Sequence, residues 1–154
     1  MSRPHDRMVR ALKETVVPRL RSRGFKGTFP HFRRRRLEQV DLLSFQFDKW
    51  GGGFVIEIAR CAPEGVIHPS GNRIPAADMT AWNVHPMERV RLQPSLGSST
   101  SDWFRYDRPA AAKGIDVYAE VAEQVLPYLE SAEKWWNGED DAYIRAFEAH
   151  FRGR

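Results

Sequence analysis

The chain has 154 residues, of which 42% are hydrophobic and 29% are charged, and its formal net charge is +4. A chain of this length folds around one core of its own, so we expect a single domain over residues 1–154. The one cysteine excludes an internal disulfide bond, and no apolar run is long enough for a signal peptide or a membrane span. These observations predict a cytoplasmic protein with no membrane partner.

The charge is divided unevenly along the chain. Residues 1–60 hold 14 Lys and Arg against 6 Asp and Glu, a net of +8, whereas residues 61–154 hold 10 against 14, a net of −4. Such asymmetry is typical of a nucleic-acid-binding face, but it also arises when two parts of one fold attract each other. We favour the second explanation, because charged helix surfaces are common.

The first predicted element is a helix over residues 4–23. Apolar residues recur there at spacings of three and four, which gives one apolar stripe: Met8, Leu12, Val16, Val17 and Leu20. Pro18 predicts either a kink or the start of a second short helix, because a proline inside a helix removes a hydrogen bond. Gly24 is a suitable end for the helical segment.

Three strands are expected next, over residues 29–36, 40–50 and 54–61. A two-residue loop at Gly51-Gly52 would pair Phe47 with Ile56 and Phe45 with Ile58. That pairing brings the apolar rows of both strands to one side of the sheet, whereas a slip by one residue would separate them. The glycine segment is therefore predicted to be a hairpin turn rather than a phosphate-binding loop.

The stretch HFRRRRLEQVDLLSFQF, residues 31–47, places four arginines inside a strand pattern. A tight turn at Leu37-Glu38 would pair Phe32 with Leu43 and Arg34 with Asp41. Side chains alternate along a strand, so this basic cluster is divided between two faces of the sheet: Arg33 and Arg35 on one, Arg34 and Arg36 on the other. We favour the solvated end of a hairpin, with a nucleic-acid site as the alternative.

The middle of the chain is less regular. Prolines and glycines between residues 62 and 83 predict a long irregular loop, and such loops are often functional. A fourth strand is expected over residues 84–92, although Pro86 weakens its pattern. A polar loop over residues 94–101 and a short fifth strand over residues 102–106 follow.

The C-terminal third is predicted to be helical. Its apolar stripe recurs at helical spacing: Tyr118, Val121, Ala122, Val125, Leu129 and Ala132. Pro127 predicts a kink or a fresh start, Asn137-Gly138 a break, and Tyr143, Phe147 and Phe151 a last helix. The fold class is therefore α+β, with an N-terminal helix, a four- to five-stranded antiparallel meander and two or three C-terminal helices on one face.

Recognised catalytic and metal-binding motifs are absent from the sequence. The five histidines fall at no metal-ligand spacing, and Cys61 has no partner cysteine. We therefore expect no catalytic residue, no metal and no cofactor, and we interpret Cys61 as a small buried side chain at the end of an apolar strand.

The strongest candidate for a binding site combines arginine with tryptophan. Arg89 and Arg91 share one face of the predicted fourth strand, and Trp103 and Arg105 follow on the next segment. Arginines beside aromatic rings bind carboxylates, phosphates or an acidic protein surface. In the competing interpretation Trp103 belongs to the core and the arginines pair with acids of the C-terminal helices, such as Glu120 or Glu123.

Four segments resemble a known family when they are read in order: LRSRGFKGTFPHFRRR, VDLLSFQFDKWGGGFVIEIARC, RVRL and DWFRYD. They are similar to the bacterial family catalogued as domain of unknown function 4304, over roughly residues 5–135. Trp103-Phe104 stands where that family often has two tryptophans. The resemblance implies a small single-domain bacterial cytoplasmic protein, and it brings no reaction and no catalytic residue.

We expect a protein-binding module, because the Arg and Trp side chains suit a protein partner. Some small α+β families serve as immunity or accessory proteins of toxin systems, which is an analogy at the level of the fold. The alternatives are a nucleic-acid-binding protein that uses the basic N-terminal part, and an enzyme with an Arg/Trp-lined anion site.

Overall fold

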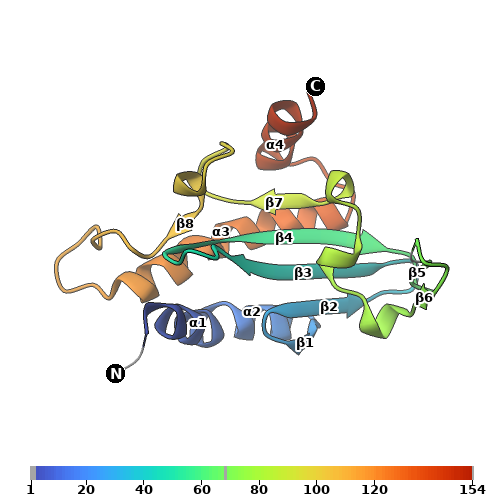
Figure 1. Ribbon diagram of the computed structural model, residues 1–154, viewed down its shortest axis with the longest axis horizontal. Helices are drawn as coiled ribbons and strands as arrows, with labels where there is room; N and C mark the ends of the chain where they lie inside the picture. Colours follow the sequence, from blue (N-terminus) through green and yellow to red (C-terminus); the bar gives the residue numbers. More distant parts are fainter. Residues whose placement is uncertain (1–2, 68, 154) are drawn as a thin grey trace.

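A central antiparallel sheet packs against helices from both ends of the chain (Figure 1). The computed structural model describes residues 3–67 and 69–153. Its helices and strands are α1 (Pro4–Thr15), α2 (Val17–Ser22), β1 (Lys26–Thr28), β2 (His31–Arg35), β3 (Val40–Phe47), β4 (Gly53–Cys61), β5 (Val66–Ile67), β6 (Arg73–Ile74), β7 (Val90–Leu92), β8 (Phe104–Arg105), α3 (Val117–Trp136) and α4 (Ala142–Arg152). The α+β class is confirmed.

The main sheet has the order β1-β2-β3-β4-β7, and β8 also pairs with β4, so it has six strands rather than four or five. Every pairing is antiparallel. The short hairpin of β5 and β6 forms a separate two-stranded sheet. Figure 1 shows α4 beyond β7, at the outer edge of the main sheet.

One face of the main sheet packs against the helices. Phe45, Ile56 and Ile58 are fully buried there with residues of α1 and α3, and Phe47 packs against the same cluster. The apolar stripes predicted within residues 4–23 and 118–132 supply the opposite side of this core. The prediction that these apolar residues lie on one side of the sheet is thus confirmed, and Phe47 is half-buried there.

The opposite face of the sheet has a core of its own, which the sequence did not predict. Val40, Leu42 and Ala59 are buried under residues of the 62–89 segment, among them Met79 and Val84. That segment contains the 3-10 turns η1 (Ala76–Asp78), η2 (Ala81–Asn83) and η3 (Pro86–Glu88). The predicted irregular loop is therefore a cover for the sheet. The fourth strand begins at Val90 rather than at residue 84, because Pro86 lies in a turn.

The glycine hairpin joins β3 and β4, but its predicted register was wrong by two residues. Phe45 pairs with Ile56 and Phe47 with Phe54. Asp48 N donates to Gly53 O at 2.9 Å, which closes a longer loop than the predicted pair of glycines. A shift of two residues preserves the face of every side chain, so the apolar rows still coincide. Trp50 is 85% exposed at the tip of this loop.

The two helical prolines behave differently. Pro18 lies in the first turn of α2, which confirms the predicted second short helix. Pro127 lies inside α3, which continues without interruption to Trp136, so the predicted fresh start is wrong. Pro127 is on the exposed side of α3, where a carbonyl that loses its helical partner can turn to solvent. In the described part of the chain, no helix has the length and apolarity that crossing a membrane requires.

Candidate functional site

The arginine run of β2 holds the fold together instead of forming one basic surface. Arg34 donates to the fully buried carboxylate of Asp41 at 2.8 Å and to both carboxylate oxygens of Glu133 on α3 at 2.7 and 3.0 Å. Its guanidinium also lies 4.7 Å from the centre of the Phe25 ring. With 14% of its side chain exposed, Arg34 is not the solvated residue that we predicted.

The other three arginines follow the predicted alternation. Arg36 is on the same side as Arg34 and donates to Asp41 at 2.5 Å. Arg33 is on the opposite side and donates to the carbonyl of Met79 at 3.1 Å, so it fastens the 62–89 segment. Arg35 is exposed. Three of the four residues of the predicted nucleic-acid cluster are thus engaged in contacts within the protein.

These ion pairs also shift the pKa values of Glu133 and Arg34. Burial alone would raise the pKa of Glu133, but the hydrogen bond from Arg34 and the charges of Arg34, Arg36 and Arg23 outweigh burial, and the pKa lies below its ordinary value. Burial alone would lower the pKa of Arg34, and its hydrogen bonds to Glu133 and Asp41 raise it instead. The network therefore keeps both partners charged at neutral pH.

Arg89 and Arg91 converge on a partner that was not expected from the sequence. Glu57 of β4 lies directly across from Arg91 in the register, and its carboxylate accepts from Arg89 at 2.8 Å and from Arg91 at 3.1 Å. The competing interpretation, in which the arginines pair with acids of the C-terminal helices such as Glu120 or Glu123, is wrong about the partner of Arg89 and Arg91. The only available signal was the position of Glu57, the one acid of β4, between the apolar residues Ile56 and Ile58.

The four predicted site residues line two different hollows. Trp103 is 9% exposed, and the Arg91 guanidinium lies 5.4 Å from the centre of its ring. Trp103 and Arg105 line a small hollow of about 260 Å³ between the 94–109 segment and α3, whereas Arg89 and Arg91 line another one. The sequence thus identified neighbouring residues, but they do not face one common site.

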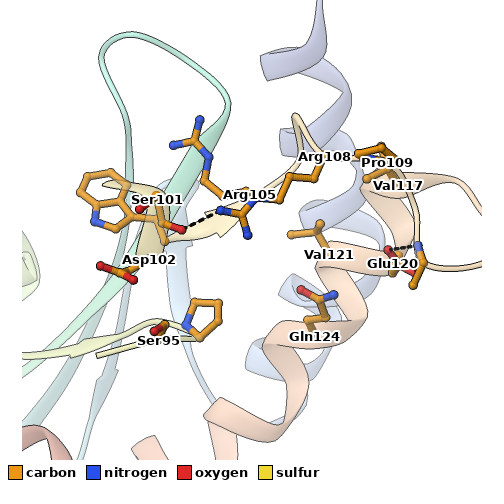
Figure 2. Close-up of a pocket in the computed structure, with 13 residues that line it drawn as sticks. Ser95, Ser101, Asp102, Arg105, Arg108, Pro109, Val117, Glu120, Val121 and Gln124 are labelled. Atoms are coloured by element: carbon orange, nitrogen blue, oxygen red, sulfur yellow. Dashed lines mark hydrogen bonds between the residues drawn. The ribbon is translucent and has the colours of Figure 1, made fainter. Parts of the chain in front are cut away.

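Figure 2 shows the hollow beside Trp103. Arg108 reaches across it and donates to the carbonyl of Ser101 at 2.9 Å, while Glu120 accepts from the backbone N–H of Ala111 at 3.0 Å. The guanidinium of Arg105 points toward the β3–β4 loop, where it contacts Asp48 at 3.3 Å and also pairs with Asp107. The hydrogen bond to Asp107 is the main cause that raises the pKa of Arg105. Arg105 therefore stabilises the position of that loop through its ion pair with Asp48.

The second hollow is a groove of about 450 Å³ between β7, η3 and the end of α4, and we call it the β7–α4 groove. Six of its lining residues give it its chemical character: Glu57, Met87, Arg89, Arg91, Phe151 and Arg152. Its volume is within the range typical of ligand and peptide sites.

The rim of the β7–α4 groove is apolar and exposed. Met87 is 61% exposed and Phe151 is 38% exposed, and they come from η3 and α4. Trp82 of η2 is 44% exposed, but its ring packs edge-on against His31 of β2 with 4.5 Å between the ring centres, so it does not line the groove. Among the described residues, seven large apolar side chains are exposed, and two of them, Met87 and Phe151, line this groove. Exposed apolar side chains that meet in one groove are typical of contact sites.

The charge of the groove is positive. Arg89, Arg91 and Arg152 line it together with the carboxylate of Glu57, and Glu148 pairs with Arg152 beside it, so three positive and two negative charges leave a formal net of +1. The nitrogens of Arg89 are all used, by Glu57, Val84 O and Trp82 O. The side chains of Arg91 and Arg152 are 33% and 23% exposed. They are the cations that a ligand in the groove would meet.

Side chains of α4 hold the helix against the outer edge of β7. Tyr143 contacts the backbone of Arg91 and Gln93, and Arg152 donates to the carbonyl of Arg89. Burial raises the pKa of the Tyr143 hydroxyl far above its ordinary value. The wall of the groove is thus built on a protonated, hydrogen-bonded tyrosine.

No group of three or more His, Cys, Asp or Glu side chains able to hold a metal ion occurs within residues 3–67 and 69–153. Burial is the main cause that raises the pKa of the Cys61 thiol, and the charges of Asp41 and Glu64 add to it. This environment disfavours the thiolate. Cys61 is half-buried at the end of β4.

The fold and its surface define a small α+β domain with a basic, apolar-rimmed groove at one edge of its sheet. The chain belongs to the family described as Domain of unknown function (DUF4304), whose model matches residues 16–131. Comparison with the curated proteins found no match, and comparison with the solved structures found none either. The matched region contains Arg89 and Arg91 and ends before α4, so the helix that completes the groove lies outside it.

Proposed function

We propose that the protein is a protein-binding module whose contact surface is the β7–α4 groove and its rim. The observation that carries this proposal is the combination of exposed Met87 and Phe151 with the guanidinium groups of Arg91 and Arg152 in one groove. An immunity-like or an accessory role would both use such a surface, because both depend on holding another protein.

The composition of the groove supports a protein contact. Aromatic residues, Met and Arg are enriched where protein interfaces are buried, because they offer a large apolar area together with directed hydrogen-bond donors. The groove rests on a rigid base, since Glu57, Arg89 and Arg91 belong to or adjoin paired strands. Its wall, α4, is fixed by side-chain hydrogen bonds. Such a surface changes little on binding, which reduces the entropic cost of association.

This proposal keeps two of the four residues predicted from the sequence at the centre of the site. Arg89 holds Glu57 and the 81–89 segment, and Arg91 presents its guanidinium to the groove. Trp103 supports Arg91 from beneath, and Arg105 clamps the β3–β4 loop. In this arrangement Arg105→Ala changes stability more than it changes binding.

Selection of peptides from a phage-displayed random library tests the proposal without requiring the identity of the natural partner. Peptides enriched on the wild-type protein are synthesised and titrated against the double variant Met87→Ser, Phe151→Ser. The matched control is Ile115→Ser, which removes an apolar side chain that is also exposed, at 48%, on the 107–116 loop. We expect the double variant to bind about tenfold or more weakly, a loss of about 1.4 kcal/mol or more, and the control to bind as wild type.

Two outcomes would overturn the proposal: no peptide is enriched, or the enriched peptides bind the double variant as well as the wild-type protein.

The two alternative functions considered from the sequence are tested by other measurements. A nucleic-acid-binding protein would bind a DNA or RNA duplex at low salt, and Arg33→Ala with Arg35→Ala would weaken that binding and flatten its salt dependence. An enzyme would need convergent ionisable groups in a deep pocket.

A further inference from the structure

We infer that the β7–α4 groove selects an acidic partner segment, in which a carboxylate meets Arg91 and Arg152 while a neighbouring apolar side chain enters between Met87 and Phe151. This inference rests on the proposed function and adds the chemistry of the partner. Three properties of the groove support it: the cations that are free to bind, the side chains that the apolar rim accepts, and the net charge that discriminates between partners.

Of the three arginines in the groove, Arg89 is used for contacts within the protein, whereas Arg91 and Arg152 are available to a partner. Arg89 is held within the protein by all three of its nitrogens, because its Nε donates to Val84 O at 2.7 Å and its two Nη atoms donate to Glu57 and Trp82 O at 2.8 Å each. Arg91 directs Nε and Nη2 to Glu57, at 3.1 and 3.0 Å, and within the described part of the chain its Nη1 has no partner. Arg91 can therefore donate to a second carboxylate while it keeps its ion pair with Glu57.

Arg152 supplies the second cation from the opposite wall. It pairs with Glu148 one helical turn earlier at 3.0 Å, and it also donates to the carbonyl of Arg89. The pair with Glu148 is partly exposed, with side-chain exposures of 23% and 44%, so solvent and salt weaken it. An incoming carboxylate competes with Glu148 for this guanidinium at little cost.

The apolar rim sets the second requirement. Met87 has three rotatable side-chain bonds and an exposed end, so it adapts its shape to an inserted side chain. Phe151 packs against Phe147 with 4.9 Å between the ring centres, so the aromatic wall continues into the buried core. A free carboxylate ion would leave this rim exposed to water. An acidic segment that also carries an apolar residue covers both parts of the groove.

Charge decides between partners of similar shape. The net positive charge of the groove, +1 with Glu148 counted, attracts an acidic segment and repels a basic one, and like charges brought together in a partly desolvated site are costly. The acidic residues 139–141, which precede α4, lie at the other end of the helix from Arg152. The groove therefore lies at the C-terminal end of α4, which is its basic end.

The probe is a labelled synthetic peptide of about twelve residues that contains Glu and Phe in a Gly/Ser background. Its neutral analogue has Gln in place of every Glu. Both peptides are titrated by fluorescence anisotropy into wild-type protein and into Arg152→Gln, Arg152→Lys and Arg91→Gln. Arg145→Gln is the matched control, because Arg145 lies on the same helix and pairs with Asp140 on the exposed surface. Urea unfolding of each variant confirms that it folds.

We expect the acidic peptide to bind at least tenfold more tightly than its neutral analogue, and salt to weaken this preference. Arg152→Gln and Arg91→Gln should each weaken acidic binding about five- to tenfold, Arg152→Lys should restore much of it, and Arg145→Gln should leave it within about twofold. Equal binding of the two peptides, or an equal loss with Arg145→Gln, would overturn the inference. If library peptides occupy the groove but are neutral or basic, this inference fails and the proposed function stands; if no peptide occupies the groove, both fail.

Discussion

The hydroxyl of Tyr143 on α4 donates a hydrogen bond of 2.6 Å to the carbonyl oxygen of Arg91 on β7. The same hydroxyl accepts from the backbone N–H of Gln93 at 3.0 Å. These are the backbone groups that the outer edge of a sheet would offer to a further strand, so one side chain satisfies an edge that is otherwise open to pairing. Tyr143 therefore both protects the sheet and fixes the wall of the β7–α4 groove.

Tyr143→Phe tests this dual role. The variant keeps the ring and leaves two part-buried backbone groups without this partner, so we expect a loss of about 1–3 kcal/mol in the free energy of unfolding. We also expect weaker binding of groove peptides, because α4 is held less firmly. Tyr128→Phe is the matched control, since Tyr128 packs edge-on against Tyr143 and its hydroxyl has no hydrogen-bond partner among the described residues. Urea unfolding followed by tryptophan fluorescence measures both variants, and equal stability of the two would contradict this role.

Arg34→Ala and Arg35→Ala compare two adjacent residues of the arginine run. Arg34 contacts buried Asp41 and Glu133, so its removal leaves a buried carboxylate with fewer donors, and we expect a loss of about 3 kcal/mol in stability. Arg35 is exposed, and we expect a change within about 0.5 kcal/mol. Thermal or urea unfolding distinguishes them. Similar small effects from both substitutions would mean that the buried network adds little to the fold.

Glu133→Gln tests the electrostatic part of that network through its pH dependence. The pKa of Glu133 is lowered in the folded protein, so the unfolded chain binds the proton more tightly. Its contribution to stability is therefore fully present above the ordinary pKa of 4.5 and is lost as the pH falls through the lower pKa of the folded state. We expect Glu133→Gln to be less stable than wild type at pH 7, with the difference shrinking below pH 4.5.

Glu123→Gln provides the matched control for this pH profile, because Glu123 is an exposed residue of the same helix. Its unfolding free energy should follow that of the wild-type protein across the acid range. A difference between wild type and Glu133→Gln that stays constant from pH 7 to pH 3 would show that the carboxylate charge of Glu133 contributes nothing to folding.

Much of the sheet could be predicted from the sequence because strand faces repeat every two residues. The turn at Leu37-Glu38 fixes the pairing of Phe32 with Leu43, and the structure has that pairing. The glycine hairpin was harder, because several loop lengths preserve the same faces. Asp48 decides the outcome, since its carboxylate accepts from the N–H of Trp50 at 3.0 Å and shapes the longer loop.

The second core of the sheet could not be predicted, because its residues follow no period. Met79 and Val84 lie in or beside one-turn 3-10 helices, where no stripe can develop. Their burial depends on contacts with Leu42 and Ala59, which are distant in the sequence. A segment rich in proline and glycine can therefore be a well-packed cover as easily as a mobile loop.

The candidate site was predicted in part. A spacing of two residues correctly placed Arg89 and Arg91 on one face, and the helical spacing of Phe147 and Phe151 correctly predicted a last helix. The meeting of these elements depends on the hydroxyl of Tyr143 and on the cross-strand position of Glu57. Neither contact leaves a local pattern, so the groove emerges from the fold alone.

Whether the β7–α4 groove is the binding surface is measured most directly by titrating ¹⁵N-labelled protein with a library-selected peptide and following amide chemical shifts. We predict that the shifts concentrate on Met87, Arg91 and Phe151, and that Phe151→Ser clearly reduces them at the same peptide concentration. Shifts that concentrate on the 33–36 run or on the loop around Trp50, with the β7–α4 groove unchanged, would contradict a binding role for the groove.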